Sequence, residues 1–175
     1  MKTLLTATIL VATILVGASV ASAQNSTGTL TVTATVASSI GLTFENDLAG
    51  VALAGAGTNA ATMAFGAVSA YGAITTTGVT RTVGASDFTV SSLFGVQVVR
   101  ANSSSSNYML AAALGTPDAT NTWRINSTTL TGSNQNLGTS YTYGLNVAHT
   151  LYLTVPFTAS SGAISRVVNF TATAN

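Results

Sequence analysis

The single histidine is the first place to look for catalysis in this sequence. His149 is the only histidine in 175 residues, and a Ser-His-Asp triad would have to use it together with Asp87 or Asp118. The sequence contains no Gly-x-Ser-x-Gly elbow, the turn that presents a nucleophilic serine. His149 also leads directly into an alternating apolar stretch, so we expect it to be structural. The sequence therefore predicts that this protein is not an enzyme and has no small-molecule substrate.

The closest pair of carboxylates is Glu45 and Asp47, which flank Asn46. Two carboxylates could serve as the acid and base of a glycosidase or, with the asparagine, contribute to a calcium site. Calcium takes about six or more oxygen ligands, and one short loop supplies too few. Because Asn and Asp side chains close turns, we expect a turn here. With one histidine and no cysteine, the sequence predicts neither a metal site nor a cofactor.

A third candidate site is aromatic. Trp123 beside Arg124, together with Tyr141 and Tyr143, could form a platform on which a sugar ring stacks. Aromatic residues at strand positions also fill cores and make cross-strand pairs, and both interpretations stay open at this stage. The first would make the protein a monomeric secreted adhesin or a carbohydrate-binding β-sandwich module, with Trp123, Tyr141 and Tyr143 as possible ligand-binding residues.

The elements that must position these residues are predicted to be β-strands. Helix signals are weak, since Gly50, Gly55 and Gly57 interrupt the alanine-rich stretch 48–64 and each glycine costs about 1 kcal/mol in a helix interior. Elsewhere, β-branched and aromatic runs are separated by glycine, serine and asparagine, which is typical of strands and turns. We expect strands over 29–36, 42–44, 62–70, 74–80, 87–92, 94–101, 108–114, 122–126, 141–147, 150–158 and 164–174.

Many short strands with glycine-rich turns predict an all-β protein with an immunoglobulin-like β-sandwich. Among the later strands, Leu151, Leu153 and Val155 alternate cleanly with polar residues. Pro156 indicates an edge or a bulge, because proline cannot donate to a ladder. A turn at 160–162 predicts that the last two strands form a hairpin.

The first 23 residues have the features of a secretory signal peptide. Lys2 precedes an apolar run over about 4–20, and Ala21-Ser22-Ala23 fits the small-x-small pattern of signal peptidase. An uncleaved anchor is the alternative, because the run is close to membrane-spanning length, but the Ala-Ser-Ala end favours cleavage. We therefore expect a secreted protein. Its predicted parts are a removed signal peptide (1–23), an N-terminal extension with a donor strand, that is, a strand that could pair with a neighbouring molecule (24–40), and a β-sandwich domain (41–175).

The charge balance and the residue types argue against a nucleic-acid partner and against covalent cross-links. Of the five basic residues, Lys2 leaves with the signal peptide, so four arginines balance four carboxylates in the remaining chain. A basic surface for nucleic acid is therefore not expected. The remaining chain has neither cysteine nor lysine, which excludes disulfides and isopeptide cross-links. Any assembly must be held by backbone hydrogen bonds and buried apolar surface.

The most regular strand pattern stands at the start of the predicted secreted chain. Leu30, Val32, Ala34 and Val36 alternate with threonines, and Ile40 has the same parity. This period of two gives one apolar face and one polar face. Such a strand can be the first strand of its own sandwich, or it can pair with a neighbouring molecule, and the pattern is compatible with both.

Three stretches of this chain resemble subunits of chaperone–usher pili, in particular the spore coat protein U-like branch. The alternating segment 30–36 is similar to the opening strand of that group, and Ala64-Phe65-Gly66-Ala67-Val68 resembles the Phe-Gly turn that follows it. The segment 167–173, Val-Val-Asn-Phe-Thr-Ala-Thr, resembles the closing strand. The chain departs from many members in having no cysteine, and it lacks the penultimate tyrosine of classical pilins.

The resemblance implies a sandwich that lacks its last strand and a groove that the N-terminal extension of the next subunit fills. The implied function is that of a structural subunit of an extracellular, cell-surface filament, a homopolymer built without covalent links. A periplasmic chaperone and an outer-membrane usher are its implied assembly partners. The residues implied to insert are Leu30, Val32, Ala34 and Val36, with Ile40 near the exit of the groove.

Overall fold

A computed structural model describes residues 29–175 of the chain. The predicted signal peptide and residues 24–28 of the predicted extension lie outside these described residues. Within 29–175, no helix is long and apolar enough to cross a membrane. Residues Val36–Asn175 form one compact unit.

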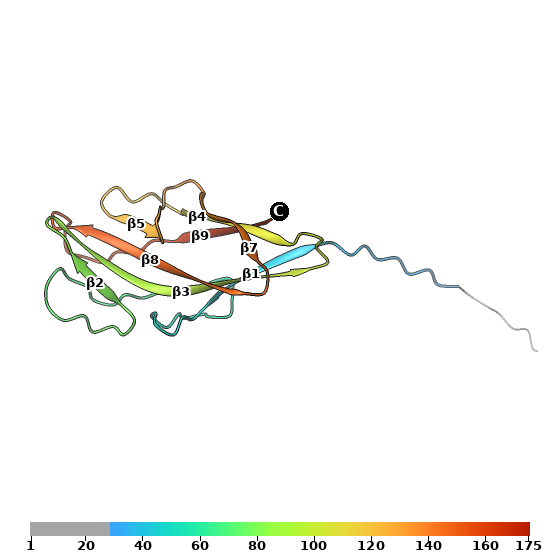
Figure 1. The fold of residues 1–175 in the computed structure, drawn as a ribbon, viewed down its shortest axis with the longest axis horizontal. Helices are drawn as coiled ribbons and strands as arrows, with labels where there is room; N and C mark the ends of the chain where they lie inside the picture. Colours follow the sequence, from blue (N-terminus) through green and yellow to red (C-terminus); the bar gives the residue numbers. More distant parts are fainter. Residues whose placement is uncertain (1–28) are drawn as a thin grey trace, which may run out of the picture. The chain divides into compact units, whose positions relative to one another are not determined.

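Every regular element of the described residues is a β-strand, as the sequence predicts. Glycine, serine and threonine separate the strands, and no helix forms between residues 29 and 175. The strands are arranged in two antiparallel sheets (Figure 1). Their bounds are β1 Ser39–Glu45, β2 Thr80–Val83, β3 Asp87–Ala101, β4 Asn107–Leu114, β5 Thr122–Ile125, β6 Thr128–Thr129, β7 Gln135–Thr142, β8 Asn146–Pro156 and β9 Val168–Ala174.

The larger sheet is built around β3 and β8, which lie side by side along the sandwich (Figure 1). Its strand order is β1-β3-β8-β5-β6, and β2 also pairs with β3. One edge of the fifteen-residue β3 is shared: β2 pairs with residues 88–91 and β1 pairs with residues 95–101. Strand β3 therefore joins two short strands into one sheet.

The smaller sheet has the order β7-β4-β9. In an immunoglobulin sandwich, one sheet has the order A-B-E-D and the other contains C, F and G. Here β1-β3-β8-β5 matches the first order, and β4-β9 matches C and F. Among the described residues no strand follows β9 at the position of G, so the sheet ends at β9.

The core lies between the sheets and is built by alternation. In β3 the residues from Phe88 to Val98 that share one parity point inward and are buried. Ser92 takes one of these inward positions, and its hydroxyl oxygen accepts a hydrogen bond from the Val51 backbone N–H at 2.8 Å. Other large members of the core come from β4, β5 and β8: Tyr108, Leu110, Trp123, Ile125, Leu153 and Val155.

The strands expected at 62–70 and 74–80 are wrong. That segment forms a long connection, and only β2 at its end is regular. Gly66, Gly72 and Gly78 adopt positive φ there, which breaks an extended backbone. The guanidinium of Arg81 donates to two carbonyl oxygens of the connection, 2.7 Å from Ser69 and 2.8 Å from Gly72. Hydrogen bonds from a side chain thus replace a β-ladder.

The predicted closing hairpin is also wrong, because β8 and β9 belong to different sheets. The intervening segment crosses from one sheet to the other and carries Arg166, whose Nε lies 3.3 Å from Asp118 Oδ2. Pro156 is the last residue of β8, opposite Asp87 of β3 and beyond the end of β5. A proline is tolerated there because no second neighbouring strand requires its missing N–H.

Candidate functional site: the unpaired edge between β1 and β9

Strand β9 has a neighbour on one edge only. It pairs with β4 over its whole length, while its other edge faces β1 without joining it in a sheet. On β1, the Phe44 N–H donates to the Thr58 carbonyl at 2.8 Å and the Phe44 carbonyl accepts from the Gly57 N–H at 2.7 Å. Main-chain groups of an antiparallel strand alternate between its edges, so Ile40 and Leu42 direct theirs to the same edge, which is paired at Phe44 but has no neighbouring strand along Ile40 and Leu42. An open edge of this kind is a template for another strand.

The side chains along this edge form a continuous apolar row. The rings of Phe44 and Phe170 meet edge to face with centroids 5.1 Å apart, and Phe170 also packs on the buried Phe94 at 5.9 Å. All members of the row are only half-buried although they pack against the core. We call this row the β1/β9 seam; it consists of Ile40, Leu42, Phe44, Val168, Phe170 and Ala172.

The β9 side of the seam is not among the site residues that the sequence predicts. The alternation of Val168, Phe170 and Ala172 in the last strand was visible in the sequence, but it does not tell which neighbour a strand lacks. That information comes from the sheet order.

The predicted donor residues lie on a segment without strand pairing. Residues 29–38 contain no strand, and their side chains are exposed. Leu30, Val32 and Val36 retain 89%, 80% and 71% of their accessible surface. The first strand that the structure describes is β1, so the pairing that a self-contained sandwich would require of 29–36 is not observed among the described residues. Ile40 differs from the other predicted donor residues because it lies within β1 as part of the seam.

The three aromatic candidates for ligand binding are not all brought together. Tyr141 of β7 and Tyr143 of the following turn both pack on the buried ring of Tyr108, with centroids 5.5 Å and 5.1 Å from it. The strand expected at 141–147 is interrupted by this turn, which separates β7 from β8. Trp123 belongs to β5 in the other sheet and is only 6% exposed.

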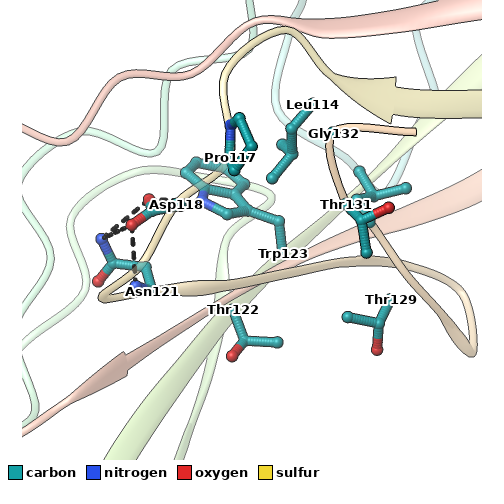
Figure 2. Close-up of a pocket in the computed structure, with 10 residues that line it drawn as sticks. Leu114, Pro117, Asp118, Asn121, Thr122, Trp123, Thr129, Thr131 and Gly132 are labelled. Carbon is teal, nitrogen blue, oxygen red and sulfur yellow. Dashed lines mark hydrogen bonds between the residues drawn. The ribbon is translucent and has the colours of Figure 1, made fainter. Parts of the chain in front are cut away.

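Trp123 borders a cavity of about 350 Å³ at the β4–β5 connection (Figure 2). Its indole Nε1–H donates to Asp118 Oδ2 at 2.9 Å, and the other carboxylate oxygen accepts from the backbone N–H groups of Thr120 and Asn121 at 3.1 Å and 3.0 Å. Burial works to raise the pKa of Asp118, but these hydrogen bonds hold it well below its ordinary value. The Asp118 carboxylate thus stabilises the β4–β5 loop through these hydrogen bonds.

The other polar candidates are engaged in hydrogen bonds within the subunit. Asp47 Oδ1 accepts from the Ala49 N–H at 2.9 Å, and Asn46 Oδ1 accepts from the Leu53 N–H at 2.7 Å, which confirms the predicted turn. His149 Nδ1 lies 3.1 Å from the side-chain nitrogen of Asn126, and Asp118 is bound as described above. Over residues 29–175, no three acidic or histidine side chains gather as metal ligands do.

Comparison with family models, with curated proteins and with solved structures found no match to this chain. Its function is therefore inferred from its own residues. Two features stand out for that purpose, namely the exposed alternating segment 29–36 and the half-buried β1/β9 seam. Each is the kind of surface that the other could cover.

Proposed function

We propose that this protein is the structural subunit of an extracellular, cell-surface filament. Each subunit inserts residues 29–36 into the β1/β9 seam of the next, where they pair with β9 as an added strand. The observation that carries this proposal is the coexistence of an unpaired alternating strand sequence with an edge that lacks a strand. Strand addition supplies main-chain hydrogen bonds for affinity and alternate side chains for specificity.

Burial of the donor side chains supplies the driving force. Full burial contributes about 1.5–3 kcal/mol for a side chain such as Leu30, Val32 or Val36. Ordering the segment and joining two molecules offset part of this gain. Covering the seam adds to the gain, because Phe170 and its neighbours are still half-exposed.

Pairing with the same molecule's β1 is disfavoured by parity. A two-residue turn at Ala37-Ser38 would place Thr35 opposite Ile40, so the threonines and not the apolar residues would face the seam. A three-residue loop restores the parity but requires a left-handed residue at Ser39. It would also remove Ser39 from its pairing with Ala101 in β3. Insertion into a second copy requires neither a left-handed residue at Ser39 nor the loss of its pairing with Ala101.

The inserting segment and the receiving seam are different surfaces, so each subunit contacts the next head to tail. Such contacts give a closed ring only if the rotation between neighbouring subunits closes, and otherwise they give an open filament. The lack of cysteine and lysine after residue 23 fits an assembly held without covalent links. The predicted signal peptide accounts for export. From the family resemblance alone, a periplasmic chaperone and an outer-membrane usher are proposed as assembly partners.

The test compares two aspartate substitutions by electron microscopy of the chain 24–175. Val32→Asp places a charge on the inserting face, whereas Thr33→Asp places the same charge one residue away on the polar face. We expect no filaments from Val32→Asp and filaments from Thr33→Asp and from the unmodified chain. Equal filament yields from the two variants would overturn strand donation, and so would an unmodified chain that remains a folded monomer at high concentration.

The alternative function, a carbohydrate-binding module or adhesin, has one supporting observation in the cavity beside Trp123. It is the weaker candidate because the buried indole has little face left for stacking on a sugar. Binding to immobilised glycans that disappears in Trp123→Ala, together with a monomeric protein, would favour it over the filament.

A further inference from the structure

His149 occupies an unusual position for a titratable group. It lies in the central strand β8, points into the core and is 1% exposed. Its ring packs against Phe94 of β3 and Tyr141 of β7, with centroids 5.8 Å and 5.9 Å away. The imidazole therefore sits between the two sheets, and neither the filament proposal nor any catalytic role makes use of it.

One asparagine connects this histidine to the neighbouring turn. Asn126 joins β5 to β6 with φ of +52°, and its backbone N–H donates to the Thr150 carbonyl at 2.9 Å. Its side-chain oxygen accepts from the Thr150 N–H at 2.9 Å, which leaves the Nδ2 amide hydrogens for His149 Nδ1 at 3.1 Å. We call these three hydrogen bonds the Asn126 clamp.

The clamp determines where the imidazole proton is. Because Asn126 Nδ2 can only donate, His149 Nδ1 must accept, and the ring proton of the neutral histidine is on Nε2. Nε2 is buried, and no hydrogen-bond partner for it occurs among the described residues. A second proton would have to go on Nδ1, where it would face the amide hydrogens of Asn126.

We propose that His149 and the Asn126 clamp make the sandwich acid-sensitive, so that one proton on His149 releases the β5–β6 turn from β8 and opens the core. Relief of the donor–donor clash requires the Asn126 amide to turn over. That rotation gives up the bond from the Thr150 N–H. The opening also leaves Phe94, which packs on Phe170 of the seam, without its ordered neighbour.

Among the described residues, the groups that pack on His149 include no carboxylate that could balance a positive charge. Asn126, Phe94 and Tyr141 are uncharged near neutral pH. The Arg100 guanidinium lies 5.1 Å over the ring of Tyr143 in the same aromatic cluster, and it carries the same sign of charge. Within residues 29–175, Asp118 forms an ion pair with Arg166 and not with His149. Burial accordingly lowers the pKa of His149.

The sign of the pH dependence follows from this lowered pKa. Above the ordinary histidine value, about 6.5, both the folded and the unfolded chain hold a neutral imidazole, and stability is at its maximum. Below about pH 6.5 the His149 imidazole binds a proton in the unfolded chain but not in the folded chain. The folding equilibrium constant therefore falls by up to tenfold per pH unit. The chain has one histidine and no cysteine, and burial raises the pKa of Tyr108 and Tyr141 away from this range. A loss of stability between pH 6.5 and 5.5 therefore reports on His149.

The test is urea unfolding of the purified protein at a fixed concentration at pH 7.5, 6.5 and 5.5. The single tryptophan, Trp123, is buried and reports unfolding by its fluorescence. We expect the folding equilibrium constant to fall about fivefold between pH 6.5 and 5.5, and about tenfold between pH 7.5 and 5.5, and to show no such trend in His149→Phe. Asn126→Asp provides the opposite charge: its second carboxylate oxygen can accept from a protonated Nδ1, so stability should hold or rise as the pH falls.

A flat pH profile in the unmodified protein, or the same slope in His149→Phe, would overturn the proposal. If His149→Phe does not fold, nitrogen NMR of the single histidine decides. Nε2–H at neutral pH, and no protonation down to pH 5.5 in the folded protein, would support the clamp, whereas Nδ1–H or titration near pH 6.5 would contradict it. These readouts concern the subunit alone, so they remain valid whether or not the protein forms filaments.

Discussion

Residues 30–36 and the second half of β8 carry the same alternation of apolar and polar side chains, yet only β8 is buried in the sandwich. Leu153 and Val155 of β8 are 3% and 7% exposed, whereas Leu30 and Val32 are 89% and 80% exposed. Strand β8 lies between β3 and β5 and faces the smaller sheet. The N-terminal segment has no strand pairing at all among the described residues.

The difference shows that alternation specifies a need for an apolar surface but not the molecule that provides it. For β8 the same chain provides that surface through long-range pairing. For residues 30–36 the proposed provider is the β1/β9 seam of a second copy.

The largest difference should come from the same substitution at the two sites. Leu153→Ala leaves a cavity in the core and should lower the free energy of unfolding of the subunit by about 2–5 kcal/mol. Leu30→Ala should change that free energy by no more than about 0.5 kcal/mol, while it reduces filament yield. Urea unfolding and electron microscopy of both variants provide the two measurements. A Leu30→Ala subunit as unstable as Leu153→Ala would show that the segment belongs to its own sandwich.

The receiving surface can be tested at Phe170. Phe170→Ala should cost about 2–3 kcal/mol of subunit stability, below the range for a fully buried phenylalanine because this ring is half-buried. It should also abolish binding of a peptide with the sequence of residues 29–36 to a chain that lacks residues 24–36. Thr171→Ala, on the exposed side of the same strand, is the matched control and should leave both properties unchanged. Undiminished peptide binding by Phe170→Ala would place the receiving edge elsewhere.

Asp118 contacts the crossover between β8 and β9 through Arg166. Asp118→Asn replaces a buried carboxylate that accepts from Trp123 and faces Arg166, and at pH 7 it should cost about 1–3 kcal/mol. Since hydrogen bonds keep the pKa of Asp118 below its ordinary 3.8, its contribution to stability is present above that value and is lost as the pH falls below it. The difference in stability between the two proteins should therefore become smaller as the pH falls from about 4 to about 2. A difference of unchanged size at pH 2 would mean that the carboxylate charge is not the cause.

The sequence was sufficient for those features that depend on local pattern. The all-β class and the two sheets follow from the period of two, and the turn at Asn46 and Asp47 follows from side chains that bond to nearby N–H groups. The wrong predictions have two causes: the strands expected at 62–70 and 74–80 fail locally, where three glycines adopt positive φ, and the closing hairpin fails because of a partner that is distant in sequence. The hairpin of β8 and β9 fails because β4, not β8, pairs with β9.

The site was only half visible for the same reason. Its inserting side could be named from Leu30, Val32, Ala34 and Val36, since an alternating segment shows its apolar face in sequence. Its receiving side is defined by the absence of a neighbour beside β9, which no local pattern encodes. The binding of Asp118 to the indole of Trp123 was likewise hidden, because the folding of the β4–β5 loop brings them together.

The smallest expected effect comes from a substitution that lets the N-terminal segment pair with its own chain, as β8 does. A self-paired hairpin of correct parity needs a left-handed residue at position 39, which costs about 1–2 kcal/mol for a residue with a Cβ atom and little for glycine. Ser39→Gly should therefore shift the balance from filaments toward self-capped monomers by about fivefold to thirtyfold, measured by sedimentation at a fixed concentration. Ser38→Gly adds the same flexibility one residue away, where no left-handed conformation is needed, and should leave the filament fraction unchanged. If both glycines act equally, flexibility and not self-pairing is responsible; if only Ser39→Gly yields monomers, the choice between own chain and neighbour depends on this one turn.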